Sequence, residues 1–281
     1  MRIYGLVHET YDENIFCLIK NGHKDYFYMA KNLTKKYNKY LRKGMKIDFS
    51  CTDEKVLHHN LLTYEVIRFY KISKFDNLGN NIFYFDSKAI QNGIKSLVNK
   101  KKPVLFIDFE MNMQDFVPIP NFVQEIIEAG LVLTDYNGAV RYVNHFYIKP
   151  TAYKRITKRT INFLEYTKET FYNAVNFKRL YDELDELNKR YKPYVMVWGK
   201  SDVSQFNKCC QINKLEPLNL NFVNLLQLHI NYYGLKESPG LFKTWEHYYD
   251  KKLPKQQHDS LEDATITKDV FFKFKEYING E

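Results

Sequence analysis

The stretch Val104–Glu110, with the sequence Val-Leu-Phe-Ile-Asp-Phe-Glu, decides the fold of this chain. It contains no Gly or Pro, and its apolar run has the length of a buried strand rather than of a helix. Residues two apart in a strand point to the same side, so Asp108 and Glu110 project together and Phe109 projects away from them. Paired carboxylates on a buried strand repel each other unless a cation compensates them, and oxygen ligands suit Mg²⁺ or Mn²⁺. The stretch therefore predicts a strand ending at a metal site, unless both acids simply reach water there.

Length and composition are typical of a soluble globular protein. The 281 residues are enough for one large core or two smaller ones, and 44% of them are hydrophobic. The four cysteines form no Cys-x-x-Cys pair, which is typical of a reduced setting. The N-terminus lacks the apolar region of a signal peptide, and no apolar run approaches the roughly 18 residues that span a bilayer. We expect a cytoplasmic protein that does not enter the membrane, and its net charge of +9 favours a polyanionic partner.

The first quarter of the chain has the pattern of short strands separated by turns. Turn signals such as Asn21-Gly22 and Lys43-Gly44 divide it. The expected strands are Ile3–His8, Ile15–Lys20, Asp25–Met29, Met45–Cys51 and Leu62–Tyr70. Five short strands in so few residues predict a small all-β barrel of the OB type over residues 1–74.

Basic and aromatic side chains are interleaved in this barrel segment. Residues 1–75 contain 14 Lys and Arg against 8 Asp and Glu, a net of +6. Such a segment suits the phosphate backbone and the bases of a single strand, and Lys35 and Lys39 are candidate phosphate contacts. The alternative is a solvated helical face, since these two lysines are four residues apart.

The same segment resembles a cold-shock barrel, on the strength of Asn14–Ile19, Asp25–Met29 and Leu41–Phe49. That family carries aromatic residues on two neighbouring strands, where they stack on single-stranded bases. The resemblance implies that Phe16, Tyr26 and Tyr28 are the stacking residues here. The family's Gly-rich first motif is absent.

A connector and a second domain follow. Residues 75–103 contain a turn-rich break and then an amphipathic helix at Ser87–Lys100. From residue 104 to residue 281, strand and helix patterns alternate, which predicts a mixed α/β sheet. After the first strand the expected elements are strands at Glu128–Asp135 and Val140–Ile148, a basic loop from Lys149 to Arg159, a helix at Phe177–Arg190 and a strand at Tyr194–Trp198.

Two later motifs add charged groups at helix starts. In Trp198-Gly-Lys-Ser-Asp202, Ser201 is expected to cap a helix that begins with Asp202. In the stretch that begins at His258, Asp259 and Glu262 have the spacing of a capping box, which starts a second helix. His258 then lies just outside this helix and Asp263 in its first turns, so both can face one site. A loop histidine alone is more often a solvated surface residue.

Asp108-x-Glu110, Asp202 and His258-x4-Asp263 together resemble the signature of DEDDh exonucleases, and most closely the Eri-type and KapD-like 3′→5′ exoribonucleases. The resemblance covers residues 104–278. It implies an RNase H-like, five-stranded mixed sheet flanked by helices. Ser260 stands where the family usually has Ala. Met111 follows Glu110 close to where a Thr often lies, and we take it as a candidate contact to the terminal nucleotide.

The resemblance also implies a mechanism and a substrate. Asp108, Glu110, Asp202 and Asp263 would hold two Mg²⁺ or Mn²⁺ ions, with Asp108 bridging them and Asp202 acting through water. His258 would accept the proton of the attacking water. Nucleoside 5′-monophosphates would leave the 3′ end of single-stranded RNA. A DNA exonuclease uses the same five residues, and a non-catalytic single-strand binding protein is a further alternative. The sequence does not indicate a protein partner.

Overall fold

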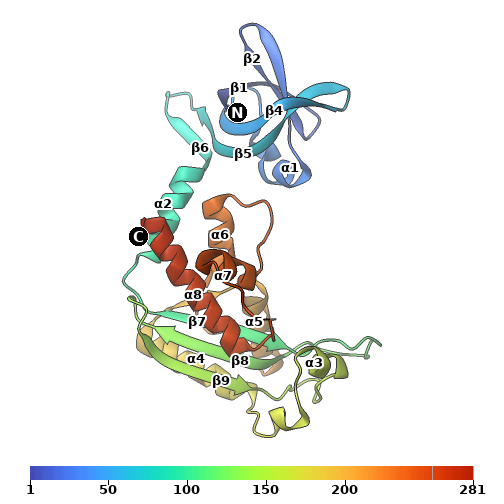
Figure 1. Cartoon of the computed structure of the whole chain (residues 1–281), viewed down its shortest axis with the longest axis vertical. Helices are drawn as coiled ribbons and strands as arrows, with labels where there is room; N and C mark the ends of the chain where they lie inside the picture. The colour runs from blue at the N-terminus through green and yellow to red at the C-terminus, as the bar shows by residue number, and fades with distance from the viewer. Residues whose placement is uncertain (255, 281) are drawn as a thin grey trace. The chain divides into compact units, whose positions relative to one another are not determined.

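The computed structural model describes residues 1–254 and 256–280 (Figure 1). The chain divides into two compact units, one made of Met1–Ile94 with His229–Glu237 and the other of Lys95–Leu228 with Ser238–Glu281. Each unit has its own cluster of buried apolar side chains. In the described part of the chain, no helix has the length and apolar character needed to cross a membrane.

The first unit is a small β-barrel. Its sheet has the order β3-β2-β1-β4-β5-β6, and a parallel pairing of β3 with β5 closes the first five strands on themselves. Short helices α1 (Lys31–Tyr37) and η1 (Asn38–Tyr40) connect β3 to β4. The strands are β1 (Arg2–Tyr11), β2 (Ile15–Lys20), β3 (His23–Tyr28), β4 (Lys46–His58), β5 (Leu61–Phe75) and β6 (Asn81–Asp86). The predicted five-stranded barrel is confirmed, whereas β6 lies in the stretch expected to be a connector.

Aromatic rings fill the barrel interior. Phe16 and Phe27 are cross-strand partners whose ring centroids lie 5.4 Å apart, and Phe49 and Phe69 pack against Phe16. Phe16 is completely buried, so the prediction that it stacks on a nucleic-acid base is wrong. The resemblance does not fix which face of β2 carries the matching position, and Phe16 lies on the face that forms the core.

The second unit is built on a five-stranded mixed sheet in the order β11-β10-β7-β8-β9. Strand β7 pairs parallel with β10 and antiparallel with β8. The strands are β7 (Val104–Met111), β8 (Ile126–Thr134), β9 (Val140–Tyr147), β10 (Tyr194–Val197) and β11 (Asn221–Asn224). This sheet confirms the predicted RNase H-like α/β class. The short edge strand β11 had no sequence pattern of its own.

Helices cover both faces of this sheet. Leu105, Ile107 and Phe109 of β7 belong to a core that includes α4 and α5, whereas Phe106 lies 5.6 Å from Phe271 of α8. Figure 1 shows α8 lying across β7 and β8. The helices from α2 onward are α2 (Ser87–Val98), α3 (Lys158–Phe163), η2 (Lys168–Phe171), α4 (Phe177–Tyr191), α5 (Ser201–Ile212), α6 (Leu225–Tyr233), α7 (Leu241–Tyr249) and α8 (Ser260–Asn279). Helix α3 begins at Lys158, in the last two residues of the segment from Lys149 to Arg159 that was expected to be a basic loop.

Candidate active site

The first pair of carboxylates lies on the face of β7 that α8 covers. Side chains alternate along a strand, so Asp108 and Glu110 share the side of Phe106, and Phe106 packs on α8. This strand passes through the middle of the sheet, with β8 on one side and β10 on the other. The sequence motif therefore places two acids on a buried strand, beneath the helix that carries the last motif.

The start of α8 brings His258 and Asp263 to these acids. Asp259 is the N-cap, and its carboxylate accepts a hydrogen bond of 2.8 Å from the backbone N–H of Glu262. The predicted helix start is confirmed at this residue. His258 immediately precedes the cap and has a φ of +54°, in the left-handed region that non-glycine residues seldom adopt. The chain thus turns sharply before the helix, and Asp263 lies in its first turn.

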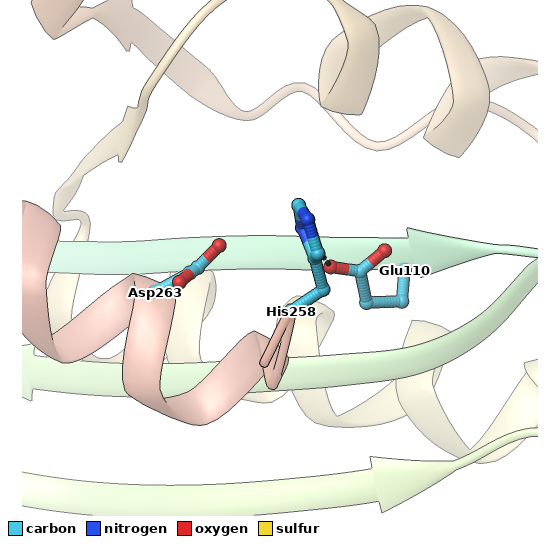
Figure 2. A group of neighbouring side chains, drawn as sticks. All are labelled: Glu110, His258 and Asp263. Atoms are coloured by element: carbon cyan, nitrogen blue, oxygen red, sulfur yellow. Dashed lines mark ion pairs between the residues drawn. The ribbon is translucent and has the colours of Figure 1, made fainter. Parts of the chain in front are cut away.

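Glu110, His258 and Asp263 meet at one place. The Nδ1 atom of His258 lies 3.8 Å from Oε1 of Glu110, and one ligand atom from each of the three residues lies within 4.8 Å of the others. Figure 2 shows the three side chains directed to the same space, Glu110 from the strand and the other two from the start of the helix. The Nε2 atom of Gln256 donates to Oδ2 of Asp263 at 2.7 Å, while the buried Oδ1 has no hydrogen-bond partner among the residues that the structure describes.

Asp202 reaches the same strand from α5. Its Oδ1 accepts a hydrogen bond of 3.3 Å from the backbone N–H of Phe109, between the two carboxylates of β7. The side chain is almost completely buried. The prediction that Ser201 caps α5 is wrong, because Lys200 is the N-cap and Ser201 is the first helical residue. The Ser201 hydroxyl instead donates to Oδ2 of Asp202 at 3.3 Å.

Burial and mutual repulsion make these carboxylates reluctant to ionise. Burial, and next the charge of Asp202, raise the pKa of Asp108 well above its usual range. Burial and the neighbouring Glu128 raise the pKa of Glu110 to about 9, and burial raises that of Asp263 to about 7. Burial also lowers the pKa of His258, so its imidazole is neutral near pH 7. A cation among these groups would relieve the repulsion that disfavours their charged forms.

The loop after β7 is tied to α3. Asn112 is completely buried, and its Oδ1 accepts hydrogen bonds of 3.1 Å from the Thr157 N–H and from the Thr160 hydroxyl. Helix α3 in turn places the half-exposed Phe163 ring 4.7 Å from the His258 imidazole. Neither Asn112 nor Phe163 had a sequence signal that pointed to the site. Met111 is half-buried and packs against the core of the unit, so its contact with a nucleotide stays a prediction.

The barrel brings three of the predicted nucleic-acid residues to one groove. Tyr28, Lys35 and Lys39 line a groove of about 770 Å³, together with Lys31, Asn14, Thr34, Asn38, His59 and the acids Asp12 and Glu13. The Tyr28 ring stacks on His58 with centroids 3.7 Å apart. Tyr26 is not among the lining residues, and its ring packs edge-on against Tyr11 at 5.5 Å.

Comparisons with known proteins identify the family of the second unit. A family model named RNase_T and described as an exonuclease matches residues 105–271. The "Probable 3'-5' exonuclease KapD" of Bacillus subtilis is 30% identical over 170 residues, which are 60% of this chain and 82% of that protein.

Two solved structures share the fold. One is the nuclease domain of 3'hExo, "a DEDDh family member, bound to rAMP", with a TM-score of 0.53 and 20% identity over 61% of this chain and 90% of that one. The other is a 3'-exonuclease structure titled "3'-end specific recognition of histone mRNA stem-loop by 3'-exonuclease". It has a TM-score of 0.53 and 21% identity, and the match covers 60% of this chain and 80% of that one. The resemblance to KapD-like 3′→5′ exonucleases is thus confirmed, and the chain belongs to the RNase_T exonuclease family.

Proposed function

We propose that this protein is a 3′→5′ exonuclease that removes nucleoside 5′-monophosphates from single-stranded RNA. The observation that carries the proposal is the convergence of Glu110, His258 and Asp263 within 4.8 Å on a face of β7 that also carries Asp108. Asp202 is hydrogen-bonded to the strand between the two β7 acids. A site with four carboxylates and one neutral histidine suits hydrolysis of a phosphodiester.

The carboxylates fit two divalent cations, and Mg²⁺ or Mn²⁺ match their oxygen atoms. DEDDh exonucleases use divalent metal ions. The buried acids of this chain have raised pKa values, and Oδ1 of Asp263 has no hydrogen-bond partner within residues 1–254 and 256–280. The two ions would be held directly by Asp108, Glu110 and Asp263. Asp202 would support the second of these two ions. When bound, such ions activate water and stabilise the charge that develops on the leaving oxygen.

His258 is the proton acceptor in this proposal. Its lowered pKa keeps the imidazole neutral near pH 7, which is the form that takes a proton from water. The ring lies beside a carboxylate that would hold an ion, since Nδ1 is 3.8 Å from Oε1 of Glu110. The exposed Phe163 ring beside His258 offers an apolar surface for the base or sugar at the 3′ end.

The barrel groove provides a second contact for the strand. Lys31, Lys35 and Lys39 supply positive charge for phosphates, and Tyr28 supplies an aromatic face for a base. In this proposal residues 1–74 form a nucleic-acid-binding domain, residues 75–103 connect the domains, and residues 104–281 form the exonuclease domain. A tethered second site raises the local concentration of a long substrate at the active site.

The preference for RNA rests on the Eri-type resemblance and on the ribonucleotide that 3'hExo binds. Matched 5′-labelled RNA and DNA strands, digested with Mg²⁺ or Mn²⁺ and separated by length and by product chromatography, test it. We expect stepwise shortening of RNA with release of 5′-monophosphates. Equal or faster digestion of DNA would instead indicate a DNA exonuclease. Binding of both strands without any product would indicate a non-catalytic binding protein.

A further inference from the structure

A second cluster of titratable side chains lies beside the active site. Glu128 of β8 is completely buried within a strand whose nine residues are all buried. Its Oε1 accepts hydrogen bonds of 2.9 Å from the backbone N–H and from the hydroxyl of Ser260, the first residue of α8. His145 of β9 places Nε2 at 2.7 Å from the same oxygen. A buried carboxylate is costly unless it is paired. These three bonds satisfy Oε1, whereas the buried Oε2 has no hydrogen-bond partner among the described residues.

The start of α8 packs directly on β8. Gly130 lies two residues from Glu128, on the same side of the strand. A Cβ atom at Gly130 would lie 2.2 Å from the carbonyl oxygen of Ser260 and 2.4 Å from the backbone nitrogen of Leu261. The backbone of α8 therefore touches the strand at Gly130 while its first N–H is bound by Glu128. These contacts fix the distance of the first helical turn from the sheet and its rotation about the helix axis.

The position of His258 depends on these contacts of the helix start with β8. It precedes Ser260 by two residues and has the uncommon φ of +54°, which persists only where the surrounding structure imposes it. The bonds of Glu128 to Ser260 and of Asp259 to Glu262 fix the chain on its C-terminal side. The contact of His258 with Glu110 spans 3.8 Å, so a small shift of the helix start would change it.

Resting on the proposed function, we infer that Glu128, paired with His145, is a positioning residue for His258. It touches no reacting atom in this account, and it acts through Ser260. His145 is the second hydrogen-bond partner of this buried carboxylate, and the hydrogen bond with Glu128 raises the pKa of the His145 imidazole. Sequence reasoning placed Glu128 only at the start of a strand and assigned no role to His145.

A double-mutant cycle in the full chain tests this inference. Glu128→Met keeps the approximate volume and removes the acceptor, and we expect kcat to fall about 100-fold, the loss typical of a catalytic group displaced by about 1 Å. In a His258→Ala background the same substitution should lower kcat less than about threefold, because the group that it positions is gone. Glu128→Gln retains an acceptor oxygen for Ser260 and should restore most of the activity.

The outcomes separate the possible roles. Glu183 is another buried carboxylate, bonded to Tyr142 and paired with Arg179 on the α4 side. Glu183→Met therefore controls for stability and should lower Tm without lowering kcat. An equal loss in the presence and absence of His258 would overturn the inference, as would full activity of Glu128→Met. If Glu128→Met does not fold, the cycle is run with His145→Gln. An inactive wild-type protein would contradict the proposed function and not the positioning role specifically.

Discussion

His258 and Glu110 face each other across 3.8 Å, although one residue lies on a turn before α8 and the other on the central strand β7. Their contact joins the last motif of the chain to the first. It places a neutral imidazole at the edge of a group of buried carboxylates whose pKa values are raised. This pairing of a base with a cluster of buried acids leads to the predictions that follow.

Replacing His258 should impair the chemical step and leave metal binding intact. His258→Ala is expected to lower kcat roughly 100- to 10,000-fold, the range for loss of a general base. Binding of Mn²⁺, followed by calorimetry, should change little, because the carboxylates remain. Loss of Mn²⁺ binding in this variant would show that His258 is a metal ligand.

Asp108→Asn should abolish activity and stabilise the metal-free protein. The substitution removes a carboxyl group whose charged form is disfavoured by burial and by the neighbouring Asp202, Asp263 and Glu110. We expect a higher Tm than that of the wild type in excess chelator at pH 8, and no digestion of RNA with Mg²⁺. The matched substitution Asp185→Asn, at a partly exposed carboxylate of α4 that pairs with Lys189, should change neither property in this way. Appreciable activity of Asp108→Asn would exclude the proposed role of Asp108.

Stability without metal should decrease as the pH rises. Raised carboxyl pKa values, about 7 for Asp263 and about 9 for Glu110, mean that the folded state holds protons that the unfolded chain has already released above about pH 5. The free energy of unfolding therefore falls between pH 5 and pH 9 in the presence of chelator. Thermal melts should show this fall, and added Mg²⁺ should raise Tm more at pH 9 than at pH 6. A melting temperature in chelator that is independent of pH would contradict this account of the site.

Lysines of the barrel groove should contribute to the salt dependence of binding. Lys35→Ala with Lys39→Ala should reduce the slope of log affinity against log salt by about 0.7 for each phosphate that these side chains neutralise in the wild type. Lys20 and Lys74 are exposed and lie outside the groove, so their replacement by Ala is the matched control. Fluorescence anisotropy with a labelled single strand at several salt concentrations measures both. Identical slopes for the two pairs would exclude the groove as the binding surface for phosphates.

The short motifs were predictable because each carries its own local physics. Asp108 and Glu110 interrupt a buried strand, and Asp259 caps a helix, so the strand, the helix start and the position of His258 all follow from nearby residues. The predicted stacking role of Phe16 was wrong because the strand pattern does not show which face of a closed barrel is the inner one. The short β11 has no periodicity to detect. Glu128 was not identified because its partners, His145 and Ser260, are distant in sequence and only the fold brings them together.

The central claim is that the five residues on β7, α5 and the start of α8 form a metal-dependent 3′→5′ exonuclease site. Digestion of a 5′-labelled single-stranded RNA by the full chain, resolved at single nucleotides, tests it most directly. We predict a ladder that shortens from the 3′ end with Mg²⁺ or Mn²⁺ and stops in excess chelator. An undigested strand with either metal, or undiminished digestion in chelator, would contradict the account.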